Sequence, residues 1–560
     1  MKRSSVDQKS GSAAFAVNTM TPCMCSLPSS PTPKFPVRCR FLPYLLLSIL
    51  VVAFGCGESD WGQPQAADVN GPLYGTFVGR NDLARFPLFA KTGLNAVVFG
   101  HTFTSELVRQ PFDEAGLDQV RLFFTTARDN GLQLVFNMTP QRGYGSDFPF
   151  PGPADPQRAN EMALIVGKVD TLYDIGVRMF MISFDDISQN SPHSGFMPAE
   201  AEAALLRAVD ARLQARNPHG TRLMVTPPYY AGTAEAVQAD KTPFSPHYPL
   251  NSGLAPSRDF LQEYGALPKR VEIFSTGPGI FSSNFSAAQI AALATLWGHP
   301  IDYWVNFPTN DVFADELVLE PFTRLEAGAL PGLRAVLLNR APNFPEASNI
   351  GVLTFGEFLA RPMDYDPQGA YQRAVDATGG TAAAALRLIA DQFQSHPVNR
   401  SAQRNESEEL RSRFLEFWSE EATCTTGPGT TGLRDLLARF MQAPHDLDVD
   451  LANRALYDEL KPHTEKLAAI GEAGLFAVDA LLTSCGPGVD AVQRGALAAA
   501  IDSQRTALAA LPSRVTEDSV PEIIQVIASD GPAFAPTNVV DDFLRRARDQ
   551  LNAAAGVNAN

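Results

Sequence analysis

The chain has 560 residues, 45% of them hydrophobic, which is enough for two or three domains with substantial cores. Its formal net charge of −16 argues against nucleic acid or an anionic membrane surface as the main partner. The eight histidines are scattered, and neither a Cys-x-x-Cys pair nor a His/Cys cluster with zinc spacing occurs, so the sequence predicts no structural metal and no cofactor.

Residues 1–56 have the pattern of an export signal. Basic residues precede an apolar run at 45–55, which is too short to predict a membrane span. The small residues before Cys56 resemble a bacterial lipoprotein cleavage site, which would make Cys56 the lipidated first residue of the exported chain. An ordinary signal peptide and an uncleaved anchor are the alternatives. We therefore expect a membrane-anchored lipoprotein, periplasmic or on the cell surface, with a secreted protein as second choice and residues 57–70 as a polar linker.

Between residues 71 and about 360, eight short apolar runs alternate with amphipathic helical stretches or long loops. This alternation predicts an α/β fold, a (β/α)8 TIM barrel. A doubly wound open sheet is the alternative, although no glycine-rich nucleotide loop follows the first run. The runs are 71–79, 95–101, 133–139, 177–185, 221–228, 271–276, 301–307 and 333–338, and the helical stretches include 113–130, 156–175, 198–215 and 286–298.

After about residue 375 the sequence is rich in Ala, Leu, Arg and Glu with helical periodicity, which predicts an all-α helical bundle. We place the barrel at 71–370 and the helical C-terminal domain at 371–560. Cys424 and Cys485 are the only cysteines beyond Cys56, so an exported chain can join them in one disulfide. The expected helices are 381–395, 406–422, 431–442, 446–483, 487–511 and 537–554.

Two adjacent carboxylates, Asp185 and Asp186, follow the apolar run 179–184. In a (β/α)8 barrel the carboxyl ends of the strands carry the chemistry. Adjacent carboxylates repel, so their pKa values can be pushed apart, and one can hold a proton while the other stays charged. The alternative is that the pair only caps the N-terminus of the next helix.

Polar and aromatic residues also stand at the ends of other strand runs. Carboxylates, amides, a phenol and an indole that converge on one mouth are what a sugar pocket needs, because hydroxyls require polar partners and sugar faces pack on aromatic rings. Each residue taken alone can equally be a core, loop or capping residue. The set is Thr102, Asp185, Asp186, Tyr230, Trp304, Asn306, Asp311 and Asn339.

Several of these residues stand in segments that resemble family 84 of the glycoside hydrolases, the β-N-acetylglucosaminidases. The resemblance covers about 71–360, and the helical tail also fits the architecture of that family. The segments are Phe184-Asp185-Asp186-Ile187, Thr276-Gly277-Pro278, Trp304-x-Asn306-Phe307-Pro308-x-x-Asp311 and Asn339.

The resemblance implies substrate-assisted, retaining hydrolysis, a departure from the usual scheme with an enzymatic nucleophile. The 2-acetamido oxygen of the sugar attacks the anomeric carbon and forms an oxazoline. Asp185 would hold and polarise the acetamido N–H. Asp186 would protonate the leaving oxygen and then activate water.

Further roles also follow from the resemblance alone. Tyr230 would orient the acetamido group, and Trp304 would wall the pocket. Asn306 would support the acidic pair, and the backbone carbonyl of Gly75 is a looser match to a sugar contact. Asp311 and Asn339 would bind sugar hydroxyls.

Some positions depart from the family pattern. The family has a sugar-binding lysine where this chain has Thr102, and an aromatic residue where it has Ser275. The expected function is an exported β-N-acetylhexosaminidase-like glycoside hydrolase acting on an N-acetylglucosamine-containing glycan or glycoconjugate. The alternative is a non-catalytic carbohydrate-binding or scaffolding lipoprotein on the same barrel, which loss of the lysine favours.

Overall fold

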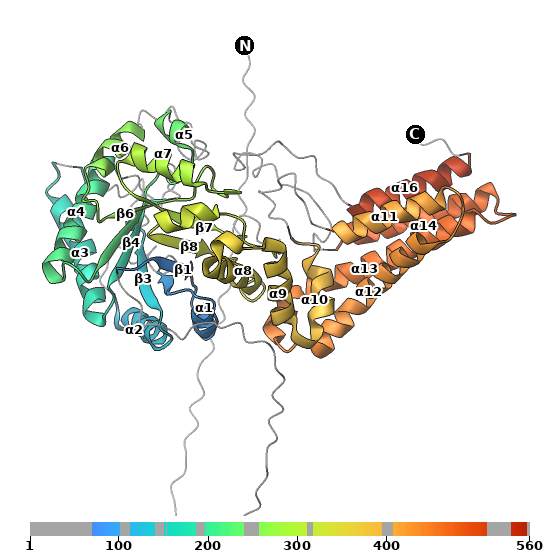
Figure 1. Cartoon of the computed structure of the whole chain (residues 1–560), viewed down its shortest axis with the longest axis horizontal. Helices are drawn as coiled ribbons and strands as arrows, with labels where there is room; N and C mark the ends of the chain where they lie inside the picture. Colours follow the sequence, from blue (N-terminus) through green and yellow to red (C-terminus); the bar gives the residue numbers. More distant parts are fainter. Residues whose placement is uncertain are drawn as a thin grey trace, which may run out of the picture. The chain divides into compact units, whose positions relative to one another are not determined.

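The computed structural model describes nine stretches of the chain (Figure 1). The export signal with Cys56 and the linker lie outside the described residues, as do Thr102, Asp186 and Asp311. The described stretches are 70–100, 112–140, 151–152, 154–185, 197–239, 257–310, 317–394, 407–511 and 539–556.

Eight parallel strands form a closed barrel in the order of the sequence, with β8 pairing back onto β1. This confirms the (β/α)8 barrel and excludes the open sheet. Each expected apolar run coincides with one strand, although β8 extends one residue beyond the last run. The strands are β1 (Leu73–Phe77), β2 (Ala96–Phe99), β3 (Gln133–Met138), β4 (Met179–Ser183), β5 (Arg222–Thr226), β6 (Glu272–Ser275), β7 (Ile301–Asn306) and β8 (Ala335–Asn339).

The strands read as continuous apolar runs because both of their faces are buried. On β4, Met179 and Met181 belong to the cluster inside the barrel, whereas Phe180 and Ile182 belong to the cluster between the strands and the outer helices. This alternation fixes which side of each strand faces the barrel axis. The helices that follow the first six strands, two of them after β5, are α1 (Phe86–Lys91), α2 (Glu114–Asp129), α3 (Gln157–Ile175), α4 (Ala199–Arg216), α5 (Ala234–Gln238), α6 (Ser257–Gly265) and α7 (Ala287–Trp297) (Figure 1).

The helical region predicted from residue 371 onward is confirmed, but it already begins directly after β8, and it has a core of its own. Leu317 and Leu319 from the connection between β7 and β8 also belong to that core, together with Ala347 and Ile350 from the chain that follows β8. The helices are α8 (Asn349–Ala360), α9 (Pro367–Gly379), α10 (Ala383–Ala390), α11 (Glu408–Glu421), α12 (Pro428–Asp450), α13 (Arg454–Ser484), α14 (Ala491–Ala509) and α16 (Val539–Ala554).

The expected break between helices 431–442 and 446–483 is wrong. Helix α12 continues through Pro444 to Asp450, and α13 begins only at Arg454. The break falls where Asn453 accepts a hydrogen bond from the backbone N–H of Leu456 and so caps α13. The predicted domain boundary at residues 370 and 371 falls inside α9.

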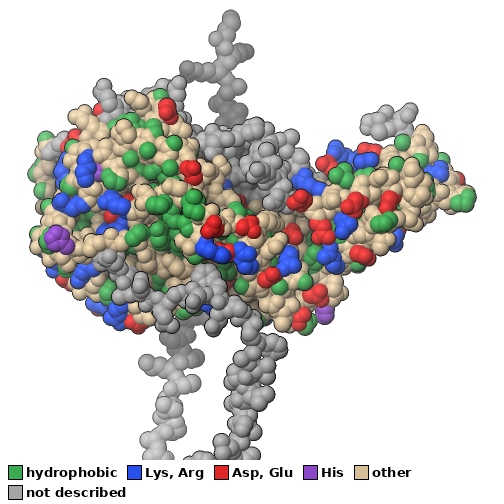
Figure 2. All heavy atoms as spheres, in the orientation of Figure 1, with side chains coloured by type: hydrophobic (Ala, Val, Ile, Leu, Met, Phe, Trp, Pro, Cys, Tyr) green, Lys and Arg blue, Asp and Glu red, His purple; other side chains and the backbone are tan. Residues whose placement is uncertain are grey.

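Helix α13 is long and apolar enough to cross a membrane by length and composition, but half of its most apolar stretch is buried within the protein. Packing in the helical core accounts for this apolar character. On the visible face, acidic and basic side chains are interleaved along the helical part (Figure 2). Within the helical part, ion pairs such as Arg434–Asp479 and Arg505–Asp541 join neighbouring helices.

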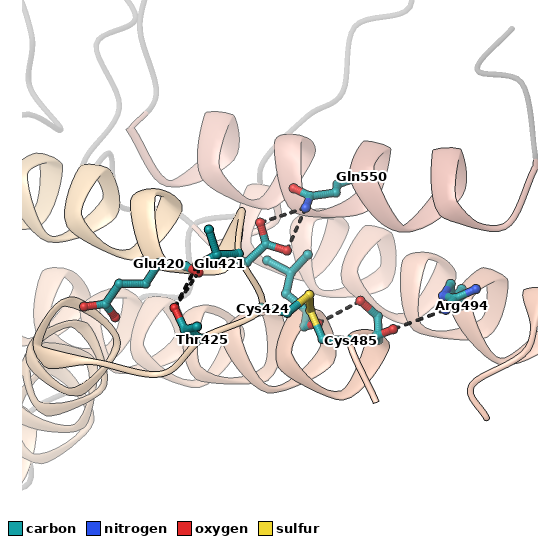
Figure 3. Close-up of a disulfide and its surroundings, with 10 residues drawn as sticks. Glu420, Glu421, Cys424, Thr425, Cys485, Arg494 and Gln550 are labelled. Atoms are coloured by element: carbon teal, nitrogen blue, oxygen red, sulfur yellow. Dashed lines mark hydrogen bonds between the residues drawn. A yellow bond between two sulfur atoms is a disulfide. The ribbon is translucent and has the colours of Figure 1, made fainter. Parts of the chain in front are cut away.

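Cys424 and Cys485 form a disulfide between the chain just after α11 and the end of α13 (Figure 3). The two cysteines of the body are therefore paired, as the sequence allows. Two carboxylates secure the same region. Glu420 accepts hydrogen bonds from the backbone N–H groups at the start of α12, including that of Thr430 at 2.7 Å, and Glu421 accepts from Gln550 of α16. These contacts hold the carboxyl-terminal end of α11 against the start of α12 and against α16.

The amino-terminal end of the barrel contains a buried ionic cluster. Arg222 on β5 donates two hydrogen bonds to Glu272 on β6, at 2.8 and 2.5 Å. Asp302 on β7 accepts from the backbone N–H groups of Arg334 and Ala335. Burial, and then the charge of Glu272, raises the pKa of Asp302 to about 7. The folded protein therefore retains a proton on Asp302 in a pH range where an unfolded carboxyl has lost it.

We predict that Asp302→Asn stabilises the fold at pH 8 but not at pH 4. Because the folded pKa is raised, the stabilising contribution of Asp302 is complete below about pH 4 and disappears as the pH rises through about 7. The amide stays neutral, and its oxygen still accepts both backbone N–H groups. The gain at pH 8 should be about 1–3 kcal/mol in unfolding free energy.

Denaturant unfolding at several pH values measures this effect. Glu272→Gln is the contrasting variant, because it leaves Arg222 buried without its carboxylate and should cost about 3–5 kcal/mol at pH 8. An Asp302→Asn effect of the same size at pH 4 and pH 8 would contradict the assigned pKa.

Candidate active site

Asp185 lies at the carboxyl end of β4, two residues beyond the inward-facing Ser183. The backbone N–H of Phe184 still donates to the carbonyl of Thr226 on β5, at 2.8 Å, so the strand alternation continues past the formal end of β4. Phe184 belongs to the outer cluster, which places Asp185 on the face that points into the mouth of the barrel. Its residue surface is only 8% exposed. Its neighbour Asp186 lies outside the described residues.

Three predicted site residues meet on β7 and β8. The Asn306 side-chain oxygen accepts from Asn339 Nδ2 at 2.9 Å and from Trp304 Nε1 at 3.2 Å. Asn306 Nδ2 in turn donates to the backbone carbonyl of Ile280, at 2.8 Å, in the loop after β6. Asn306 and Asn339 are direct partners in the strand register. Asn306 therefore ties the ends of three consecutive strands together.

The indole of Trp304 makes a second contact that the sequence analysis did not name. Phe77, the last residue of β1, stacks on Trp304 with ring centroids 4.2 Å apart. Such a pair contributes about 0.5–1.5 kcal/mol beyond its buried area. The signal was present in the sequence as an inward-facing aromatic residue at the end of the first apolar run. Phe77 therefore adds to the aromatic wall predicted from Trp304 alone.

Tyr230 stands just beyond β5, and its backbone joins the loop after β6. Its carbonyl accepts from the backbone N–H of Thr276 at 2.9 Å and from the Ser275 hydroxyl at 2.8 Å. Ser275, which replaces the aromatic residue of the family pattern, is therefore a hydrogen-bonding residue here. Tyr230 is 6% exposed. These two contacts attach the loop that carries Tyr230 to the end of β6.

A polar layer lies one step below Asp185 and was missed in the sequence. Ser183 donates to Asn137 on β3, with the two oxygens 2.8 Å apart, and Thr226 is the register partner of Ser183. Among the described residues nothing pairs with Asn137 Nδ2 or with the Thr226 hydroxyl, although both are buried. Each of the three residues stands two positions before the end of its expected apolar run, so inward parity would have identified the positions but not their pairing.

Gly75 lies deeper than the sequence comparison suggested. It pairs with Leu337, two residues before Asn339, so it belongs to the barrel wall below the mouth. A β-carbon at Gly75 would lie 2.9 Å from Leu337 Cδ2, which explains the glycine through packing. A sugar contact by its carbonyl stays a prediction that this depth disfavours.

Thr102, Asp186 and Asp311 lie outside the described residues, so their predicted roles stay untested. Within the part of the chain that the structure describes, no group of three or more His, Cys, Asp or Glu residues could hold a metal ion. The described strand ends therefore bring together one carboxylate, two amides and an indole with its aromatic neighbour, and Tyr230 stands in the adjoining loop after β5.

A family model described as beta-N-acetylglucosaminidase matches residues 86–391, more than half of the chain. The chain belongs to this family, glycoside hydrolase family 84. The resemblance seen in the sequence is thereby confirmed. The match includes all but the first strand of the barrel and extends through α10.

Curated relatives of this family 84 chain include the protein O-GlcNAcases of Rattus norvegicus and Mus musculus. Each is 21% identical over 263 residues, which cover 46% of this chain and 25% of the relative. The chain thus spans about a quarter of the length of these relatives.

Two solved structures share the fold. CpGH84B matches with a TM-score of 0.67 at 18% identity, covering 85% of this chain and 77% of its own. A mutant of the Thermobaculum terrenum O-GlcNAc hydrolase also has a TM-score of 0.67, at 17% identity, covering 88% of this chain and 96% of its own. Both matches extend beyond the barrel, because the barrel alone is too small to account for such coverage.

We predict that Asn306→Ala lowers the unfolding free energy by about 1–3 kcal/mol, because it leaves two N–H donors and one carbonyl without their partner. Asn339→Ala is the matched control, since it removes only one donor from the same cluster and should cost about 0.5–1.5 kcal/mol. Denaturant unfolding of both variants measures the difference. A larger loss for Asn339→Ala would show that Asn306 is not the centre of the cluster.

Proposed function

We propose that this protein is an exported β-N-acetylhexosaminidase-like glycoside hydrolase that acts on N-acetylglucosamine-containing glycans or glycoconjugates. Membership of family 84 supports the reaction class. The placement of Asp185 at the mouth that also holds Asn306 and Asn339 is the observation that carries the proposal, because it brings a carboxylate to the pocket where sugar hydroxyls would find amide partners.

The proposed mechanism uses the acetamido group of the substrate as nucleophile. Its carbonyl oxygen bonds to the anomeric carbon while the bond to the leaving oxygen breaks, and Asp186 gives that oxygen a proton. Asp185 accepts a hydrogen bond from the acetamido N–H, which concentrates negative charge on the attacking oxygen. Water then opens the oxazoline as Asp186 takes back a proton. Two inversions at the anomeric carbon retain its configuration.

The spacing of the two carboxylates favours this route. An enzymatic nucleophile and an acid must flank the sugar ring, with carboxyl groups about 5–5.5 Å apart in retaining glycosidases. Asp185 and Asp186 are consecutive residues at one strand end, so both approach the sugar from the same strand. That arrangement suits one carboxylate on the acetamido group and the other on the leaving oxygen.

The remaining site residues bind and shape the pocket in this proposal. Trp304, held by Phe77, walls the sugar, and Tyr230 orients the acetamido group. Asn306 and Asn339, already linked by their side chains, meet the sugar hydroxyls. Asp311 would bind further hydroxyls on the same ring.

A non-catalytic carbohydrate-binding lipoprotein is the second candidate, favoured by Thr102 in place of the sugar-binding lysine of the family. Hydrolysis of 4-nitrophenyl β-N-acetylglucosaminide by the purified protein separates the two. An enzyme of the proposed kind releases 4-nitrophenol, barely attacks the plain glucoside and is inhibited by a thiazoline that resembles the oxazoline. Thiazoline binding without release of 4-nitrophenol indicates the binding protein. If the protein shows neither thiazoline binding nor release of 4-nitrophenol, both candidates are overturned.

Substituting the acid sharpens the same assay. Asp186→Asn should slow hydrolysis of poor leaving groups by about 10²- to 10⁴-fold and affect activated aryl leaving groups much less, because these depart without a proton. Asp185→Asn is the matched control, since loss of the acetamido acceptor should slow both substrate types alike. Equal losses from Asp186→Asn on both substrates would exclude Asp186 as the acid.

Export and lipidation at Cys56 are part of the proposal. The apolar run before Cys56 supports them, and so does the Cys424–Cys485 disulfide, since disulfides persist in oxidising compartments. Cys56→Ser should move the protein from the membrane fraction to the soluble exported fraction of the producing cell. An unchanged membrane fraction would argue for an uncleaved anchor instead.

A further inference from the structure

The chain that follows Asn339 folds around one buried arginine. Arg340 is 5% exposed, and its Nε donates to the Ser348 hydroxyl at 3.2 Å. Its Nη2 donates to the carbonyl of Pro345 at 3.3 Å and to Asp82 Oδ1 at 3.1 Å. The loop 340–348 is therefore closed from inside by the residue directly after Asn339.

The carboxylate of Asp82 joins this loop to the chain after β1. Its Oδ1 also accepts from Arg85 Nη1 at 2.6 Å, and its Oδ2 accepts from the backbone N–H of Gly79 at 2.6 Å. Arg85 pairs in addition with Glu346, which lies in the loop that Arg340 closes. Asp82, Arg85, Glu346 and Arg340 thus form a ring across the ends of β1 and β8. We call these four residues the charge ring.

Helix α13 of the helical part and its cap residue form hydrogen bonds to the same loop from outside. Glu459 accepts from the backbone N–H of Glu346 at 2.9 Å and from that of Ala347 at 2.8 Å. Asn453, the cap of α13, donates to Glu346 Oε2 at 2.9 Å. Ser348 makes no side-chain cap for the helix α8 that follows. The carboxylate of Glu459 therefore serves backbone donors that the loop does not satisfy by itself.

Apolar packing supports these polar contacts. The ring of Phe344 in the loop lies 5.6 Å from that of His463 on α13, centroid to centroid. Ala347 and Ile350 are buried in the helical core. Both faces of loop 340–348 are thus held, one by the charge ring and the other by α13.

We propose that Glu459 and Arg340 are positioning residues for sugar binding, through which α13 sets the position of Asn339. The inference rests on the proposed function, in which Asn339 meets a sugar hydroxyl. Asn339 is the last residue of β8, so the path of the chain at Arg340 decides how its side chain leaves the strand. Displacing loop 340–348 shifts Asn339 relative to Asn306, which its Nδ2 contacts at 2.9 Å.

Glu459→Gln in the full protein tests the proposal. The amide keeps the size of the side chain but replaces one acceptor oxygen with a donor, which faces backbone N–H groups. We expect KM for the aryl N-acetylglucosaminide to rise about three- to tenfold with kcat nearly unchanged, as for a residue that acts on binding through others. Glu465→Gln on the exposed side of the same helix is the matched control and should leave KM unchanged.

A double-mutant cycle with Asn339→Ala separates positioning from general stability. If Glu459 acts through Asn339, then Glu459→Gln adds no further rise in KM once Asn339 is alanine. Additive effects on KM, or a fall in thermal stability without any change in KM, would show that Glu459 only stabilises the fold. Arg340→Lys, which keeps the charge but loses the fork of donors, repeats the test from the inner side of the loop.

Hydrogen exchange of the backbone N–H groups of Glu346 and Ala347 gives a readout without substrate. Glu459→Gln should speed their exchange at least about tenfold, because a charged acceptor is lost. If Glu459→Gln speeds exchange but the wild-type protein hydrolyses no substrate, the contact between α13 and the loop is supported and the proposed function is overturned instead. Unchanged exchange would overturn the positioning role itself.

Discussion

Closure of the eight parallel strands into one barrel is the constraint on which the rest of the molecule depends. Once the sheet closes, alternate residues of every strand must fit inside a narrow interior, whatever their chemistry. The interior is accordingly layered. It has ionic residues such as Arg222 and Glu272 at one end, an apolar middle that includes Met181 and Leu337, and amides at the mouth. Strand parity decides whether a side chain enters the interior, and the position of the residue along its strand decides at which end of the barrel it lies.

The two polar ends of the barrel solve different problems. At the amino-terminal end Arg222 and Glu272 neutralise each other, and the raised pKa of Asp302 favours its uncharged form. The buried charges at this end are thus balanced within the protein, and the end serves stability. At the mouth the amides of Asn306 and Asn339 use only part of their hydrogen-bonding capacity on each other. The unused capacity is what a sugar hydroxyl can engage, while the mutual bond limits how far either side chain can move.

The sequence allowed the barrel, the helical tail and the carboxylate at the end of β4 to be predicted because each is encoded locally, by period and by strand parity. The break between α12 and α13 was misplaced because α12 continues through Pro444, which the packed helix accommodates. The Asn137–Ser183 contact and the charge ring could not be predicted, because they join residues 46 and about 260 positions apart. Only the closed barrel brings such pairs together.

The helical part and the mouth share the segments that follow the last two strands. Leu319, from the connection after β7, and Ile350, beyond β8, are buried in the helical core, while Asn306 and Asn339 at the ends of those strands form the amide pair of the mouth. The connection from Asn339 to Ile350 is anchored at both ends and therefore transmits displacement, because neither end can relax alone. The helical part therefore belongs to the architecture of the site, although none of its described residues is among those placed at the mouth. Its core holds the strand ends on which the amides stand.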